Sequence, residues 1–117
     1  MNNLEKELLK WFSQEYPEFK LGKAISSLVV SDREYTGGGF VTSFTKNIIE
    51  GCSSSFNLDG PLVKASILEI GAETTLIISN GQIDCLDVLV IGNGNIEGLE
   101  TFNLVAQEIN VIYDINT

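Results

Sequence analysis

The sequence predicts an α+β fold in which an N-terminal helix packs on an antiparallel meander of five or six strands. Two observations carry this prediction. An amphipathic segment at the start of the chain stops at Pro17, and an Asn80-Gly81 dipeptide separates two apolar, β-branched stretches. The length of 117 residues suits one domain, and no linker or internal repeat divides the chain. We therefore expect residues 1–117 to form a single α+β domain.

The first element expected is a helix over residues 4–16. Its apolar side chains recur at helical spacing: Leu4, Leu8, Leu9, Trp11, Phe12 and Tyr16. Asn2 or Asn3 is suited to cap the helix, and Pro17 ends it because proline lacks a backbone donor. An exposed interaction patch is the alternative for the three aromatic residues, although this spacing is more typical of a core.

Two strands are expected next, over residues 24–34 and 40–45, joined by a turn at the three glycines 37–39. A phosphate-binding loop would need a Gly-Lys-Ser/Thr sequence opening a helix, whereas these glycines precede a strand. Residues 47–60 are rich in serine and glycine, which predicts a long irregular connection that is either mobile or functional.

The second half of the chain reads as hairpins. Residues 62–70 predict a strand ended by a turn at 71–73, and residues 74–79 and 82–91 predict a hairpin closed by Asn80-Gly81. Polar and apolar residues lose their alternation near Asp87, so the strand over 82–91 is either covered on both faces or bulged.

The last segments are less regular. Gly92-Asn93-Gly94-Asn95 predicts a turn, and its glycines do not match the spacing of a dinucleotide-binding fingerprint. One or two terminal strands follow, with a short helix over residues 99–107 as the alternative.

The absence of histidine narrows the chemistry that the chain is able to perform. Ser-His-Asp and Cys-His catalysis are excluded as they are usually built, as are histidine-ligated zinc sites. Cys52 and Cys85 lie too far apart for a metal or redox motif. We expect Cys85 to be a small buried hydrophobe and Cys52 to be exposed. The sequence thus predicts a protein that is not an enzyme, with no cofactor and no metal.

Charge is the strongest functional signal. The net charge is −9 at pH 7, and no Lys or Arg follows Lys64. This balance disfavours nucleic acid and anionic membranes as partners and allows a basic protein. The candidate partner-binding residues are acids of the second half: Glu69, Glu73, Asp84, Asp87, Glu97 and Glu100.

Two other acidic arrangements have weaker support. Asp84 and Asp87 are three positions apart, so on a regular strand they point to opposite faces and do not form a catalytic pair. Asn93, Asn95 and Glu97 loosely resemble a calcium loop but lack its twelve-residue pattern.

We therefore expect a non-enzymatic interaction module, and a bacterial immunity or inhibitor protein that neutralises a basic toxin fits best. The alternative is a small-molecule-binding domain or a minor enzyme that uses carboxylates with Tyr35 or Tyr113. A homodimer through a sheet edge or a helix face is a third possibility. No signal peptide or membrane span is evident, which predicts a cytoplasmic location.

Two segments, Arg33-Glu34-Tyr35-Thr36-Gly37-Gly38-Gly39-Phe40 and Asn80-Gly81-Gln82-Ile83-Asp84-Cys85-Leu86-Asp87, carry a resemblance when they are taken together. The pair resembles a group of small, uncharacterised bacterial proteins with a Tyr-Thr-Gly-x-Gly-Phe segment and a later Asp/Asn-Gly hairpin that ends in Leu-Glu or Leu-Asp. The resemblance spans about residues 28–90. It implies one α+β unit and brings no known activity.

Overall fold

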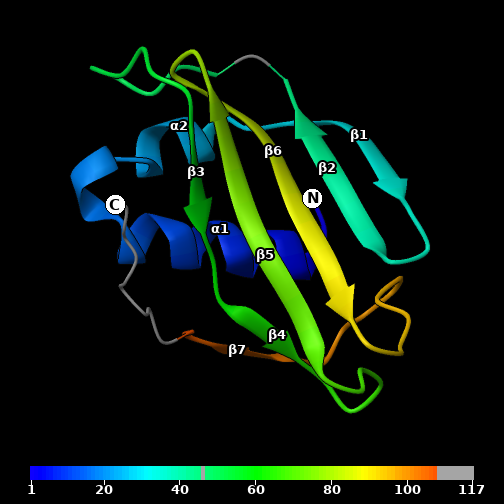
Figure 1. Ribbon diagram of the computed structural model, residues 1–117. Coiled ribbons are helices and arrows are strands. Elements are labelled where there is room, and N and C mark those ends of the chain that lie inside the picture. The colour runs from blue at the N-terminus through cyan, green and yellow to red at the C-terminus, as the bar shows by residue number, and fades with distance from the viewer. Residues whose placement is uncertain (46, 108–117) are drawn as a thin grey trace, which may run out of the picture.

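The computed structural model describes residues 1–45 and 47–107 and confirms the α+β class. Within these residues, two α-helices lie on one side of an antiparallel sheet of seven strands, in place of the five or six strands expected (Figure 1). The elements are α1 (Asn3–Glu15), the 3₁₀ turn η1 (Pro17–Phe19), α2 (Gly22–Ser26), β1 (Val30–Tyr35), β2 (Gly39–Phe44), β3 (Phe56–Asp59), β4 (Leu62–Lys64), β5 (Gly71–Ser79), β6 (Gln82–Ile91) and β7 (Asn103–Val105).

The sheet is built around the β5–β6 hairpin. The strand order is β1-β2-β6-β5-β4-β7, and β3 pairs with β5 beside β4. Asn80 and Gly81 both have positive φ, at 50° and 75°, as a type I′ turn requires, so the predicted hairpin is confirmed. The predicted turn at glycines 37–39 is also confirmed, since it joins β1 to β2.

Helix α1 covers one side of the core. Its buried side chains Leu4, Leu8, Leu9 and Phe12 belong to one cluster with the inward residues of β5 and β6. Trp11 and Tyr16 are half-buried against the same cluster, so the core interpretation of the aromatic residues is confirmed. Among the described residues, no helix combines the length and apolar character needed to cross a membrane.

The segment after Pro17 differs from the expected strand. Residues 22–26 form α2, and β1 begins only at Val30. Leu21, Ala24 and Leu28 are buried, and this spacing of three and four is helical. The β-branched residues Val29 and Val30 then start the extended chain. The expected strand over residues 24–34 was therefore wrong in its first half.

The connection over residues 47–60 is more ordered than expected. Residues 56–59 form β3, whose Leu58 is buried opposite Leu76. Asn47 is 5% exposed. Its Nδ2 donates to the Ile83 carbonyl and its Oδ1 accepts from the Ile83 amide, both at 2.8 Å. Asn47 therefore takes the place of a strand neighbour beside the start of β6.

The β4 region is shorter than expected. Only Leu62–Lys64 of the expected strand over residues 62–70 is extended, and residues 71–73, expected to be a turn, begin β5. Farther on, residues 92–95 form the expected turn, and β7 shows that a strand, not a helix, lies within 99–107. An expected strand that includes residues 109–115 lies outside the described residues.

Strand β6 is central and bulged. Ile77 pairs with Cys85 whereas Ile78 pairs with Ile83, so Asp84 is the extra residue of a β-bulge. The predicted irregularity is confirmed, although it occurs before Leu86 and not at Asp87. Beyond the bulge, Leu86 and Val88 face the helices, while Cys85, Asp87 and Leu89 face the other way.

Candidate functional site

The sheet surface opposite the helices is not packed against another described element, so it is the candidate functional surface of the fold. We call it the open face. Inward residues of β2, β5 and β6, such as Phe40, Leu76 and Leu86, are buried beneath the helices. Their alternating neighbours point away from the helices and remain partly or fully exposed. Figure 1 views this face, with both helices behind the sheet and no described element in front of it.

Apolar side chains gather around Asp87 in the middle of the open face. Val41, Ile77, Cys85 and Leu89 lie on adjacent strands, and Leu89 is 51% exposed. The register places Cys85 between Ser43 and Ile77 and places Leu89 between Gly39 and Glu73. This is a half-exposed apolar centre on a surface that the described residues leave uncovered.

Acidic side chains lie within and around that centre. Strand alternation, pairing register and the bulge put six on the open face: Asp32, Glu34, Asp59, Glu73, Asp84 and Asp87. Ser79 Oγ donates to Asp84 at 3.1 Å, which holds that carboxylate on this side. The one basic residue at an open-face position of the described strands is Lys64, whose Nζ donates to the Ile70 carbonyl. The open face is therefore strongly anionic.

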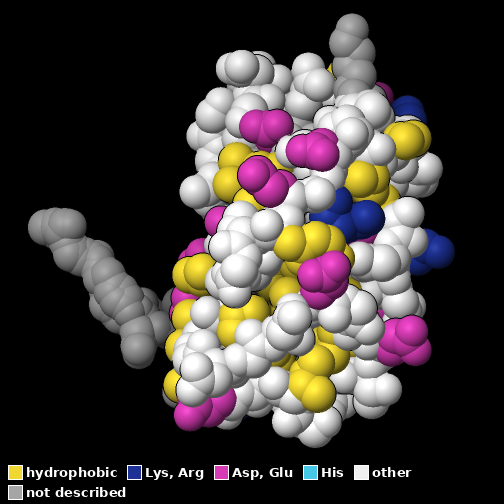
Figure 2. All heavy atoms as spheres, turned by 90° about the vertical axis from the view of Figure 1, so that its right-hand side faces the viewer, with side chains coloured by type: hydrophobic (Ala, Val, Ile, Leu, Met, Phe, Trp, Pro, Cys, Tyr) yellow, Lys and Arg dark blue, Asp and Glu magenta, His cyan; other side chains and the backbone are white. Residues whose placement is uncertain are grey.

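Three of these acids form a row across the sheet. Glu34 is opposite Val41, Val41 is opposite Asp87, Asp87 is opposite Thr75, and Thr75 is opposite Asp59. We call Glu34, Asp87 and Asp59 the acidic row. An acid thus occupies every second strand along one line of the sheet. Figure 2, which views the β1–β2 side of the molecule, shows acidic side chains interspersed with hydrophobic ones.

The structure divides the six predicted partner-binding acids into two groups. Glu73, Asp84 and Asp87 lie on the open face. The other three acids lie in loops near the C-terminal end of β6: Glu69, Glu97 and Glu100. Glu69 accepts hydrogen bonds from the backbone and side chain of Asn93 at 2.9 and 3.3 Å, so it ties two loops together.

The open-face acids Asp32, Glu34 and Asp59 were missed because the sequence argument followed net charge along the chain. The first half of the chain is nearly balanced in charge, yet β1 and β3, the strands that carry these three acids, contain no Lys. The signal that could have found Asp32 and Glu34 is their spacing of two residues, which puts both on one face of a strand. Asp59 was assigned to a loop, so its alternation with Leu58 was not considered.

Both cysteine predictions were wrong. Cys85 faces the open side and is half-exposed, because the bulge at Asp84 shifts it away from the core. Burial, together with the charges of Asp84 and Asp87, raises the pKa of the Cys85 thiol. Cys52 is half-buried and packs against the core cluster. The acidic surroundings keep the Cys85 thiol protonated at neutral pH, which is the opposite of nucleophile activation.

A second polar cluster is buried between α1 and the sheet. The Glu5 side chain is completely buried, and Arg33 Nε and Nη2 each donate to it at 2.6 Å. Thr42 Oγ1 donates at 2.5 Å and the Asn2 amide at 2.9 Å. Asn2 Oδ1 accepts from the Glu5 amide, which completes a capping box at the start of α1.

This cluster is structural and not catalytic. Burial raises the pKa of Glu5, but hydrogen bonds from Arg33, Thr42 and Asn2 and the charge of Arg33 outweigh it, so the pKa lies below its usual value. A catalytic acid or base needs a pKa near the working pH and access to substrate. Glu5 has neither, because its carboxylate is enclosed by its partners.

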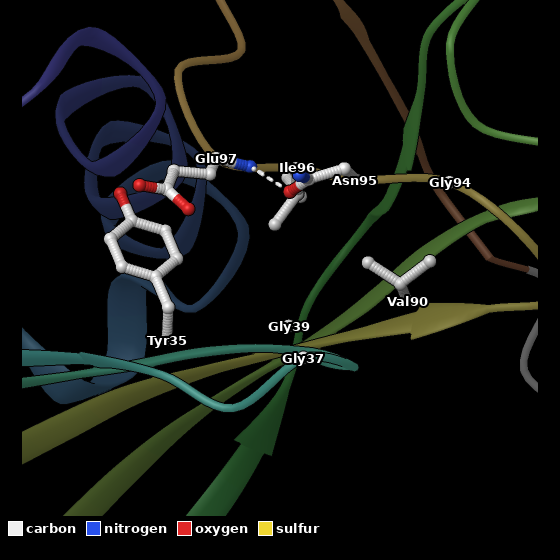
Figure 3. Close-up of a pocket in the computed structure, with 8 residues that line it drawn as sticks. All are labelled: Tyr35, Gly37, Gly39, Val90, Gly94, Asn95, Ile96 and Glu97. Atoms are coloured by element: carbon white, nitrogen blue, oxygen red, sulfur yellow. Dashed lines mark hydrogen bonds between the residues drawn. The ribbon is translucent and has the colours of Figure 1, made fainter.

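A small pocket lies where the β1–β2 turn meets the loop after β6. It encloses about 210 Å³, and its lining includes Tyr35, Gly39, Ile96 and Glu97. Figure 3 shows the Tyr35 ring and the Glu97 carboxylate directed toward each other from the two sides. Small-molecule sites usually enclose ~300–1,000 Å³, so this pocket falls below their range. Tyr113, the other tyrosine considered, lies outside the described residues.

The loop considered for calcium uses its polar atoms internally. Asn95 Oδ1 accepts from the Glu97 amide at 2.9 Å, and Asn93 bonds to Glu69. Within residues 1–45 and 47–107, no cluster of three or more His, Cys, Asp or Glu side chains is arranged to hold a metal ion. The expectation that Asp84 and Asp87 point to opposite faces was wrong, because the bulge at Asp84 puts both on the open face, where Ser79 Oγ donates to Asp84.

Comparison of this chain with protein-family models, curated proteins and solved structures finds no significant match. The resemblance to small bacterial proteins therefore stays a prediction. The functional argument depends on the open face itself.

Proposed function

We propose that this protein is a non-catalytic interaction module that binds a basic protein through the open face of its sheet. One observation carries the proposal: six acids lie among and around half-exposed apolar side chains on a face that no described element covers. Apolar surface surrounded by one sign of charge is typical of a protein-binding site, in which the charge selects the partner and speeds association.

The negative charge of the open face also argues against a second copy of this chain, a nucleic acid or an anionic membrane as the partner. A second copy stacked on this face would place acid against acid, and a nucleic acid or anionic membrane would meet the same repulsion. Neutralisation of a basic toxin, such as a nuclease, is the biological role that this surface fits best, and the proposal includes it as the specific case.

Capture from a native lysate with matched baits tests the proposal. The face variant Glu34→Gln/Asp59→Asn/Asp87→Asn removes three charges from the open face. The control variant Glu7→Gln/Glu15→Gln/Glu18→Gln removes three exposed charges on the helix side, at α1 and η1. At about 50 mM salt, we expect wild type and the control variant to retain a basic protein that the face variant loses.

Binding should weaken steeply as the salt is raised to about 500 mM, because exposed charges are then screened. The retained protein, once purified, should bind wild type in calorimetry at least tenfold tighter than the face variant. Equal retention by all three baits, or retention of neutral and acidic proteins alone, would contradict the proposal.

A further inference from the structure

The spacing of the acidic row leads to a more specific statement about the partner, which depends on the proposed function. Neighbouring strands of a sheet lie ~4.8 Å apart. Glu34, Asp87 and Asp59 are on β1, β6 and β3, with β2 and β5 between them. The acidic row therefore repeats every ~9.6 Å, and its three members span ~19 Å across the strands.

Three acids in line occur only across the strands. Along single strands, the open face has two acids on β1, Asp32 and Glu34, two on β6, Asp84 and Asp87, and one each on β3 and β5. A partner that pairs its charges with the acidic row must therefore lie with its long axis across the strands.

A repeat of ~9.6 Å distinguishes an α-helix from an extended strand. An α-helix rises ~1.5 Å per residue, so residues seven apart are separated by ~10.5 Å and stay within about 20° of one face. In an extended strand, residues three apart are separated by ~10 Å but point to opposite sides. Of these two, only the helix places cations at the required interval and on the same side.

The surroundings of the acidic row are suited to such a helix. The positions between the acids hold Val41 and Thr75, which are half-exposed and have short side chains. Leu89 and Ile77 flank the row on either side and offer apolar contact to residues between the cations. A helix laid on the row would thus meet acids at intervals and aliphatic side chains between them.

We propose that the open face binds a basic amphipathic helix of the partner, which crosses the strands with Lys or Arg at positions i, i+7 and i+14. About fifteen residues of helix would cover the acidic row. This goes beyond affinity for a basic protein, because it fixes the shape, direction and charge spacing of the segment that binds.

Three synthetic peptides of about 17 residues test this statement. The first has an Ala/Leu background with lysines at i, i+7 and i+14. The second has the same composition with lysines at i, i+5 and i+10, which lie on different faces of a helix. The third is the first peptide with a central proline, which breaks the helix. Binding is measured by fluorescence anisotropy at about 50 mM salt with the full chain.

We expect the first peptide to bind at least tenfold tighter than the other two and to gain helical circular dichroism on binding. The face variant should lose this preference, and the control variant Glu7→Gln/Glu15→Gln/Glu18→Gln should keep it. If the first peptide binds no tighter than the others, the helical partner is wrong. The proposed function is judged separately by the capture experiment, which makes no assumption about helical structure.

Discussion

At the scale of single residues, Glu5 has the most consequential position in the structure. Its amide and carboxylate complete the cap of α1, and the same carboxylate accepts from Arg33 of β1 and Thr42 of β2. One side chain therefore fixes the start of the helix to two strands. A fully buried carboxylate is stable only while its charge is paired and hydrogen-bonded, so the partners of Glu5 are as important as Glu5 itself.

Arg33→Ala is expected to lower the free energy of unfolding by about 3–5 kcal/mol, because it leaves the buried carboxylate without its cation. Urea denaturation followed by circular dichroism measures this loss. The control is Lys23→Ala, which breaks an ion pair with Glu50 whose two side chains are each 83% exposed. That variant should show no measurable change. Equal effects of the two substitutions would show that Arg33 does not support Glu5.

The same carboxylate predicts a pH dependence of stability. The pKa of Glu5 in the folded protein is lowered below its unfolded value, which is about 4.3. Its contribution is therefore fully present above about pH 4.3 and is lost as the pH falls through the folded pKa. Denaturation curves of wild type and Glu5→Gln should converge as the pH is lowered below 4.3. Curves that keep a constant separation down to about pH 2.5 would contradict this assignment.

At the scale of elements, the β5–β6 hairpin organises its surroundings. In its turn, the Gly81 carbonyl accepts a hydrogen bond from the Ile49 amide at 2.8 Å. The Gly81 amide donates to the Ser54 carbonyl at 2.9 Å. Asn47 adds two more bonds to Ile83. The long connection before β3 is thereby attached to the turn of the hairpin.

Asn47→Ala is expected to lower the free energy of unfolding by about 2 kcal/mol, because it leaves the amide and carbonyl of Ile83 without partners. Hydrogen exchange at the Ile83 amide should become faster than in wild type. The matched variant Asn47→Asp keeps an acceptor for that amide and loses the donor to the carbonyl. It should protect the Ile83 amide better than Asn47→Ala does, and the reverse order would argue against this pairing.

At the scale of the whole molecule, charge is distributed by face. The acidic side chains on the open face lie on adjacent strands, where like charges repel. This gathering of like charges on one face costs stability. The net charge of −9 therefore understates the repulsion on the open face, because the fold brings acids from distant segments together there.

Asp87→Asn is expected to raise the free energy of unfolding by about 0.5 kcal/mol at ~10 mM salt and to have no effect at ~500 mM, because salt screens the repulsion among open-face acids. Denaturation at both salt concentrations measures the difference. Glu50→Gln, which removes an exposed charge paired with Lys23, should not raise stability at either concentration. A gain from Asp87→Asn that persists at high salt would have another origin.

The sequence by itself determined the elements that local rules govern. Pro17 ends α1, the helical spacing of Leu4, Leu8 and Phe12 buries one side of it, and Asn80-Gly81 closes the central hairpin. Each signal acts over a few neighbouring residues, so it is readable without knowledge of the fold. The short α2 and β3 were missed because brief elements owe their stability to tertiary packing more than to intrinsic propensity.

The tertiary structure alone decided the open face. Glu34, Asp87 and Asp59 come from segments far apart in the chain, and only the pairing register of five strands puts them in one row. The bulge at Asp84 also turned Cys85 outward, against the alternation read from the sequence. Charge along the chain shows that the second half is acidic, but the face on which the acids gather depends on long-range strand pairing. Such pairing is set by the packing of the whole core, and no local pattern specifies it.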